Sequence, residues 1–215
     1  MKKRMIALLL AACLGAMLAL PACAEEFSDV PEDAWYYQAV GRVTRDGWMS
    51  GSGGDAFSPD SAAARWTVVY ALWNLRGRPA AVAARAFSDI PENAEYAQAA
   101  VWACENYVAF GFDDGTFRPE APVTRIQFAL FLYRYDKWFG GRGLGGVWSG
   151  PLPFTDGATI TGDMTDAAAW TNLHGIMTGY SDGSFRPGRS VSRAEAAVAL
   201  VRYWTDLQPA GGVTV

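Results

Sequence analysis

Three segments of the chain share one spacing of apolar residues, and each begins just after an arginine, at Arg65, Arg125 and Arg193. In each segment apolar side chains recur three, four and seven positions after the first, which places them on one face of an α-helix. The matching positions are Val68, Ala71, Leu72 and Leu75, then Phe128, Phe131, Leu132 and Tyr135, then Ala196, Ala199, Leu200 and Tyr203. An isolated helix cannot bury such an apolar face away from water. The pattern therefore predicts three equivalent helices that meet around a pseudo-threefold axis.

Short motifs precede these helices in a fixed order. Residues 27–34 return 60 residues later as 87–94, and a shorter copy begins at Phe154. A Phe-x-Pro marker follows at 57–59, 117–119 and 185–187, and an arginine stands eight residues after each of its phenylalanines. Fixed order and spacing over three copies indicate an internal repeat, which determines the architecture.

Each repeat is predicted to fold as helix, loop, helix. The first helices are expected over 35–45, 96–106 and 166–173, and a glycine-bearing turn follows each of them. Two of the second helices begin with the spacing of a capping box, at Thr124 with Gln127 and at Ser192 with Glu195. Ala64 holds the corresponding position in the first repeat, so that cap is lost at a cost of about 1 kcal/mol. The expected fold class is mainly α, with three repeats around a central helix bundle.

The same markers divide the chain into segments. The predicted segments are an export signal at 1–24, repeats at 27–79, 87–139 and 154–206, a mobile glycine-rich linker at 140–153 and a flexible tail at 207–215. The signal combines a basic start, an apolar run over 5–20 and the small residues Ala22-Cys23-Ala24. Cleavage after Ala24 is the favoured interpretation, and lipidation at Cys23 is the alternative. The apolar run is shorter than the ~20 residues that span a bilayer, so no membrane span is expected in the mature chain.

Charge and composition exclude several classes of function. Without Lys2, Lys3 and Arg4, 15 basic residues face 22 acidic ones, and such a surface repels nucleic acid. One histidine and one cysteine clearly within the mature domain, Cys104, rule out a zinc site, and no cofactor is expected. Cys104 lies in an apolar context and is expected to pack in a helical core.

The motifs resemble the S-layer homology family, whose repeat runs Phe-x-Asp-Val, Trp, Gly-Tyr-x-Asp-Gly-x-Phe-Arg-Pro and Thr-Arg-Ala-Glu. Residues 111–119 and 179–187 carry the central motif, followed by Thr124-Arg125 and by 192–195. The resemblance covers residues 27–206. It departs from the family pattern at 52–56 and at 157–160, so not every groove between repeats is expected to bind a ligand.

The resemblance implies a three-pronged helical fold without catalytic activity. It implies non-covalent attachment to a secondary cell-wall polysaccharide, often one with pyruvyl ketals, at the surface of a Gram-positive or related bacterium. A structural protein of a surface layer, acting through contacts with other surface-layer proteins, is the alternative. A small cell-wall hydrolase is a more remote one, because no pair of carboxylates is singled out for glycoside hydrolysis.

The candidate ligand-binding residues follow from the chemistry of an acidic sugar. Arg65, Arg125 and Arg193 lie in the first turn of a helix, where free amides and a guanidinium suit a carboxylate. The other candidates are Asp29, Asp89 and Asp156 for sugar hydroxyls, Trp35 for stacking on a sugar ring, and Gly51, Gly111 and Gly179 for close backbone approach. Each has a structural alternative: an ion pair for the arginines, a turn or cap for the aspartates, the core for tryptophan and positive φ for the glycines.

Two enzyme-like patterns are explained by the repeat. Residues 179–183 match Gly-x-Ser-x-Gly, but Asp113 and Gly53 replace Ser181 in the other copies, and no strand precedes the turn. The Asp-Gly turns at 113–115 and 181–183 lack the spacing and the terminal glutamate of a calcium-binding EF-hand loop. Both patterns are therefore interpreted as turns.

Overall fold

The fold is known from a computed structural model that describes residues 27–83 and 87–207. The predicted export signal, with Cys23, and residues 208–215 of the predicted tail lie outside the described residues. The described part is mainly helical. Its helices are α1 (Tyr37–Arg45), α2 (Arg65–Leu75), α3 (Ala97–Glu105), α4 (Arg125–Phe139), the short 3₁₀ helix η1 (Gly157–Thr159), α5 (Asp163–Leu173) and α6 (Arg193–Leu207).

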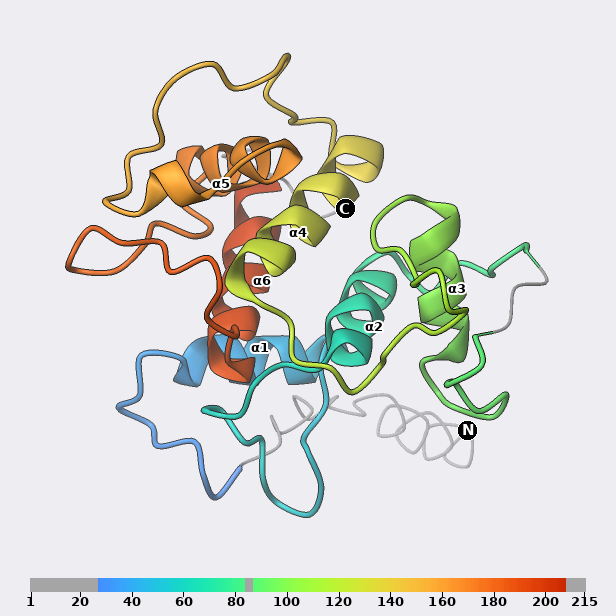
Figure 1. The fold of residues 1–215 in the computed structure, drawn as a ribbon. Helices are drawn as coiled ribbons and strands as arrows, with labels where there is room; N and C mark the ends of the chain where they lie inside the picture. The colour runs from blue at the N-terminus through green and yellow to red at the C-terminus, as the bar shows by residue number, and fades with distance from the viewer. Residues whose placement is uncertain (1–26, 84–86, 208–215) are drawn as a thin grey trace, which may run out of the picture.

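Helices pair across the boundaries between repeats. The first helix of one repeat packs on the second helix of the repeat before it, α3 on α2 and α5 on α4. The ring closes because α1, near the start of the chain, packs on α6 at its end (Figure 1). The unit of packing is therefore a pair of helices from two different repeats.

A ring of backbone hydrogen bonds joins the segments that lead into α2, α4 and α6. The amide of Val123 donates to the carbonyl of Ala63, that of Val191 to Val123, and that of Ala63 to Val191, each over 2.9 Å. All three residues are fully buried. The closed ring has the connectivity that a pseudo-threefold arrangement requires.

The starts of the second helices follow the predicted caps. Thr124 accepts from the amide of Gln127, whose side chain accepts from the amide of Thr124. Ser192 and Glu195 exchange the same two bonds at 3.2 and 2.9 Å. Ala64 makes no side-chain cap, as the sequence predicts. These caps satisfy amides that an isolated helix would leave exposed at its N-terminus.

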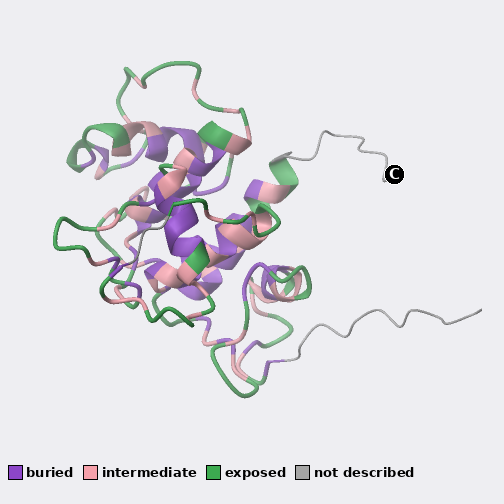
Figure 2. Cartoon of the chain, turned by 90° about the vertical axis from the view of Figure 1, so that its right-hand side faces the viewer, coloured by how far each residue is buried: buried purple, intermediate pink, exposed green. Residues whose placement is uncertain are grey.

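The core lies between the helix pairs, while the turns and connecting loops carry most of the exposed residues (Figure 2). Aromatic rings span it, including Tyr135 against Tyr203 at 5.8 Å and Trp102 against Phe139 at 5.7 Å. Cys104 is buried in this core, as expected. The tyrosine pair joins α4 to α6 across this core.

The first helices differ from the predicted bounds by one to three residues, α1 starting at Tyr37 and α3 covering Ala97–Glu105. Helix α5 begins at Asp163 and not at 166, because Gly162 adopts a φ of 65° and Asp163 and Asp166 favour a helix N-terminus. Part of the glycine-rich segment 140–153 is attached to the core: the amide of Arg142 donates to the buried Asp136 at 3.0 Å, and that of Trp148 donates to Asp166 at 2.8 Å. The mobility of this segment remains a prediction.

Candidate functional site

The three predicted arginines are buried between repeats. Nε of Arg65 donates to the carbonyl of Phe117 at 3.0 Å, and Nη2 donates to that of Phe110 at 2.8 Å. Arg193 repeats the contact on the first repeat, with Phe57 at 2.7 Å and Ser50 at 2.6 Å. Each guanidinium thus fastens its own repeat to the loop of the next one around the ring.

The amides in the first turn of the second helices are also occupied. The amide of Arg125 donates to the carbonyl of Arg189 at 2.8 Å, and that of Ile126 donates to Pro187 at 3.2 Å. The first amides of α2 and α6 bond to the neighbouring repeat in the same way. Donors that the sequence suggested for an anion are therefore used, in the structure, to hold the repeats together.

The three predicted aspartates organise the loops within each repeat. The carboxylate of Asp89 accepts from the amides of Phe117 at 2.8 Å and Arg118 at 2.7 Å. Asp29 binds the amides of residues 57 and 58, and Asp156 those of 185 and 186. Both oxygens of each carboxylate have a backbone partner, which corresponds to the turn-forming alternative.

The three predicted glycines are required for close packing. A Cβ on Gly111 would lie 2.5 Å from Cε1 of Phe87, and one on Gly51 would lie 2.8 Å from Cε1 of Phe27. Gly179 adds a positive φ of 83°, and its Cβ would lie 2.9 Å from the carbonyl of Ser184. The backbone does approach a ring closely at Gly51 and Gly111, but that ring is a phenylalanine of the same repeat.

Arg125 departs from the pattern of the other two arginines. Its Nε donates to the carbonyl of Phe185 at 2.9 Å, but its Nη1 faces Glu195 at 3.5 Å. No residue in the described part of the chain accepts a hydrogen bond from Nη2 of Arg125. Nη1 of Arg65 and of Arg193 likewise has no acceptor among the described residues, so Arg125 differs from them in facing a carboxylate and not in spare hydrogen-bonding capacity.

A hollow of about 230 Å³ opens beside Arg125, and we call it the Arg125 hollow. Its lining comes from the loop after α5, from α6 and from the first repeat, and it includes Trp35, Arg125, Tyr180, Glu195 and Arg202. Trp35 is 66% exposed, and Arg202 is also exposed. The structure thus brings three of the predicted site residues, Arg125, Trp35 and Gly179, to one place.

Tyr180 and Glu195 form a hydrogen-bonded wall of this hollow. The Tyr180 hydroxyl donates to Glu195 at 2.8 Å, and Nη1 of Arg189 contacts both groups at 2.7 to 2.9 Å. The guanidinium of Arg125 lies over the Tyr180 ring, 4.6 Å from its centre. The wall is held in place before any ligand arrives, which favours recognition.

Burial and charge shift the pKa values of these groups. Burial lowers the pKa of Arg125, while the nearby Tyr180 and Glu195 act in the opposite direction. Burial by itself would raise the pKa of Glu195, but hydrogen bonds from Ser192, Tyr180 and Arg189 outweigh it, and the pKa lies below its ordinary value. Glu195 is therefore ionised at neutral pH, and arginines surround it.

A second hollow, of about 430 Å³, lies beside Arg193 and has a different charge. It is lined by Ser50, Ser52, Trp66, Glu95 and Glu120, besides Arg193. Both nitrogens of Arg193 described above are engaged by carbonyls, and the two glutamates are exposed. This hollow is thus acidic and suits an anion poorly.

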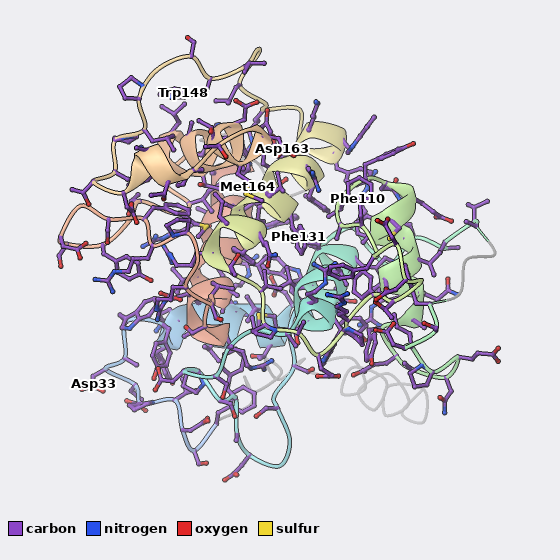
Figure 3. The ribbon with its side chains drawn as sticks, viewed as in Figure 1. Asp33, Phe110, Phe131, Trp148, Asp163 and Met164 are labelled. Carbon is purple, nitrogen blue, oxygen red and sulfur yellow. The ribbon has the colours of Figure 1, made fainter. Side chains whose placement is uncertain are left out.

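At Arg65 the neighbouring side chains are aromatic. Phe112 lies over the guanidinium at 5.4 Å, and Arg134 lies over Phe110 at 5.0 Å while forming an ion pair with Asp163 at 2.8 Å. Phe110 lies between α3 and α4 in the view of Figure 3, and Asp163 is the first residue of α5. The three sites are equivalent in the sequence but differ in access and charge.

Sequence reasoning did not select Arg202, Tyr180 and Glu195, which line the Arg125 hollow, or Arg189, which bonds to two of them. Tyr180 and Glu195 stand within the quoted motifs, so their positions were visible. Their side chains converge only because the loop after α5 folds against α6. In the part of the chain that the structure describes, no helix has the length and apolar character needed to cross a membrane, and no group of three or more His, Cys, Asp or Glu side chains is arranged for a metal.

The fold and the site define a helical protein of three tandem repeats with hollows at the contacts between them. The sequence pattern of the S-layer homology domain matches residues 26–65, 86–129 and 153–197. The chain belongs to the S-layer homology domain family.

Two similar proteins come from Acetivibrio thermocellus. Cell surface glycoprotein 1 is 30% identical over 105 residues, which is 46% of this chain and 4% of that protein. The cellulosome-anchoring protein is 27% identical over 173 residues, which is 78% of this chain and 37% of that protein. The chain thus spans little more than a third of one relative and a small part of the other.

Proposed function

We propose that this protein attaches non-covalently to the bacterial cell envelope by binding an acidic wall polysaccharide in the Arg125 hollow. The observation that carries the proposal is the grouping of an exposed tryptophan with two arginines, Trp35 with Arg125 and Arg202, around one open hollow. No bond is made or broken in this function.

The chemistry of the hollow suits a sugar that bears a carboxylate. The Arg125 and Arg202 guanidiniums supply positive charge, and the carboxylate of Glu195 is already neutralised by Arg189 at 2.8 Å. Guanidinium groups bind carboxylates through paired hydrogen bonds, so a pyruvyl ketal is a suitable ligand group. The exposed Trp35 ring suits the apolar face of the same sugar.

Membership in the family and the names of the relatives support a location at the cell surface. One relative is named as a cell surface glycoprotein and the other as an anchoring protein. The partner proposed for this chain is a secondary cell-wall polysaccharide of a Gram-positive-type envelope. Within this proposal Arg65, Arg193, Asp29, Asp89 and Asp156 keep the repeats in shape and do not touch the ligand.

The test uses the double variant Trp35→Ala/Arg202→Ala, because Arg125 also fastens two repeats and its removal would disturb the fold. Both chosen side chains are exposed, so the variant keeps the core. Co-sedimentation with purified cell walls should show binding at least ~10-fold weaker, the equivalent of about 1.4 kcal/mol. Walls stripped of their acidic polysaccharide should bind the wild type no better than the variant.

The control is Arg45→Ala, which removes an exposed arginine on α1 and changes the net charge in the same way as Arg202→Ala. It should sediment with walls like the wild type. Unchanged binding by the double variant would contradict the site. Equal wild-type binding to stripped walls would contradict the ligand, and binding that is lost when wall proteins are digested would favour assembly through protein contacts.

A further inference from the structure

Exposed aromatic rings are concentrated on the second repeat. Of the five aromatic residues classed as exposed among those the structure describes, Trp35 lines the Arg125 hollow and the other four are Tyr107, Phe110, Phe112 and Trp138. Tyr107 contacts Trp138 with centroids 5.9 Å apart and an interplanar angle of 29°, and it contacts Phe110 at 6.0 Å. We call Tyr107, Phe110 and Trp138 the aromatic platform. A contiguous exposed apolar patch of this kind marks a binding surface.

The other repeats show that the fold does not require these rings. The turn after the first helix has Gly47 in the first repeat and Gly175 in the third, where the second has Tyr107. Phe110 is replaced by Ser50, whose carbonyl accepts from Arg193 as the Phe110 carbonyl accepts from Arg65. The backbone contacts survive without aromatic side chains, so the platform serves something other than folding.

Tyr107 also adopts an unfavourable backbone conformation. Its φ is 58°, close to the 69° of Gly47 and the 66° of Gly175. Bulky residues rarely occupy this left-handed region, which glycine enters freely. The ring that is placed there remains 57% exposed, so packing does not offset the strain. Strain kept at an exposed residue points to a function at that position.

Charge on the platform is balanced, unlike that in the Arg125 hollow. The guanidinium of Arg134, 5.0 Å from the Phe110 ring, is paired with Asp163 at 2.8 Å. The platform thus has polar groups at its edge, and the described arginine that lies over one of its rings is paired. Aromatic rings next to neutralised polar groups suit a ligand with an apolar face and a polar rim, which describes an uncharged pyranose ring.

The position of the platform favours a polysaccharide over a protein. Phe110 stands where the third repeat has Thr178, and Thr178 lines the Arg125 hollow. Phe110 thus shares its repeat position with a residue of the site proposed for the acidic sugar, whereas Tyr107 and Trp138 match Gly175 and Asp206, which do not line that site. A polymer with many sugar units can engage both places at once, which raises its overall affinity.

We propose that Tyr107, Phe110 and Trp138 bind uncharged pyranose units of wall glycan by stacking, as a second site distinct from the Arg125 hollow. The inference rests on the proposed function only in taking a wall polysaccharide as the polymer. Its residues and its physical basis are different. Binding at the platform should persist at high salt, whereas binding through the arginines of the hollow should weaken.

The experiment compares the wild type with Tyr107→Gly/Trp138→Ala on protease-treated cell walls in about 1 M sodium chloride, where the Debye length is about 3 Å. Tyr107→Gly copies the glycine of the other two repeats, so the thermal midpoint of the variant should equal or exceed that of the wild type. Binding should fall roughly tenfold, as expected for the loss of stacking contacts. Leu173→Ala, which removes an exposed apolar side chain elsewhere, is the control and should bind normally.

Equal binding by the platform variant and the wild type at high salt would overturn the inference. So would a difference that appears only on walls that retain their proteins, because a protein would then be the partner. A failure of the proposed function looks different. In that case Trp35→Ala/Arg202→Ala binds normally at low salt, while the platform variant can still show its own loss.

Discussion

The guanidinium of Arg193 donates from Nε to the carbonyl oxygen of Phe57 over 2.7 Å, although 136 residues separate them in the sequence. The contact joins the last repeat to the first, and Arg65 and Arg125 make the same contact between the other repeats. Burial lowers the pKa of all three arginines, but each stays charged at neutral pH. The arginine at the start of each second helix therefore links two repeats through a hydrogen bond to the backbone.

Removal of this contact between repeats should destabilise the fold. Arg193→Ala leaves the carbonyls of Phe57 and Ser50 without their donor, and we expect the free energy of unfolding to fall by about 3 kcal/mol. Arg193→Lys should recover little of the loss, because an ammonium cannot reproduce the planar fork. Urea unfolding followed by circular dichroism measures both. A loss no larger than that of the exposed Arg45→Ala would show that the contact contributes nothing.

Gly111 should not tolerate a side chain. In Gly111→Ala the new Cβ would lie 2.5 Å from Cε1 of Phe87 and 3.0 Å from the carbonyl of Thr116, so the loop must shift. We expect a loss of about 1–3 kcal/mol in unfolding free energy. Gly143→Ala is the matched control, because nothing lies within 4 Å of its Cβ. Equal thermal midpoints for the two variants would refute the packing explanation.

Glu195 should make stability depend on pH on the acid side. Its pKa is lower in the folded chain than its ordinary value of 4.5, so its stabilising contribution is present above that pH and is lost as the pH falls further. Glu195→Gln should therefore be less stable than the wild type at neutral pH, and the difference should shrink below pH 4.5. Unfolding by urea at several pH values tests this. A difference that is constant with pH would mean that hydrogen bonding alone, without charge, accounts for the role of Glu195.

Local features were predictable because short-range physics determines them. The capping boxes at Thr124 and Ser192, the missing cap at Ala64 and the apolar stripes depend on residues three or four positions apart. The mainly α fold class and the family followed from the same short motifs. The start of α5 was missed because it depends on the φ of Gly162, which the apolar pattern does not record.

The candidate site was only partly predictable. The sequence assigned the three arginines to a ligand, and the structure shows that each of them also donates to a carbonyl of the next repeat, so their role in binding stays a prediction. Trp35 and Arg125 were both selected, yet nothing in the sequence brings them together, since Trp35 belongs to the first repeat and the hollow forms against the third.

The sequence by itself determined that this chain has three copies of one helical unit, and that each second helix begins at an arginine. Tertiary structure alone decided that the helices pair between repeats, that the arginines close a ring and that one hollow is basic and another acidic. The physical reason is that helix starts depend on neighbours within one turn. Access and charge at a junction depend on side chains that come from two or three different repeats.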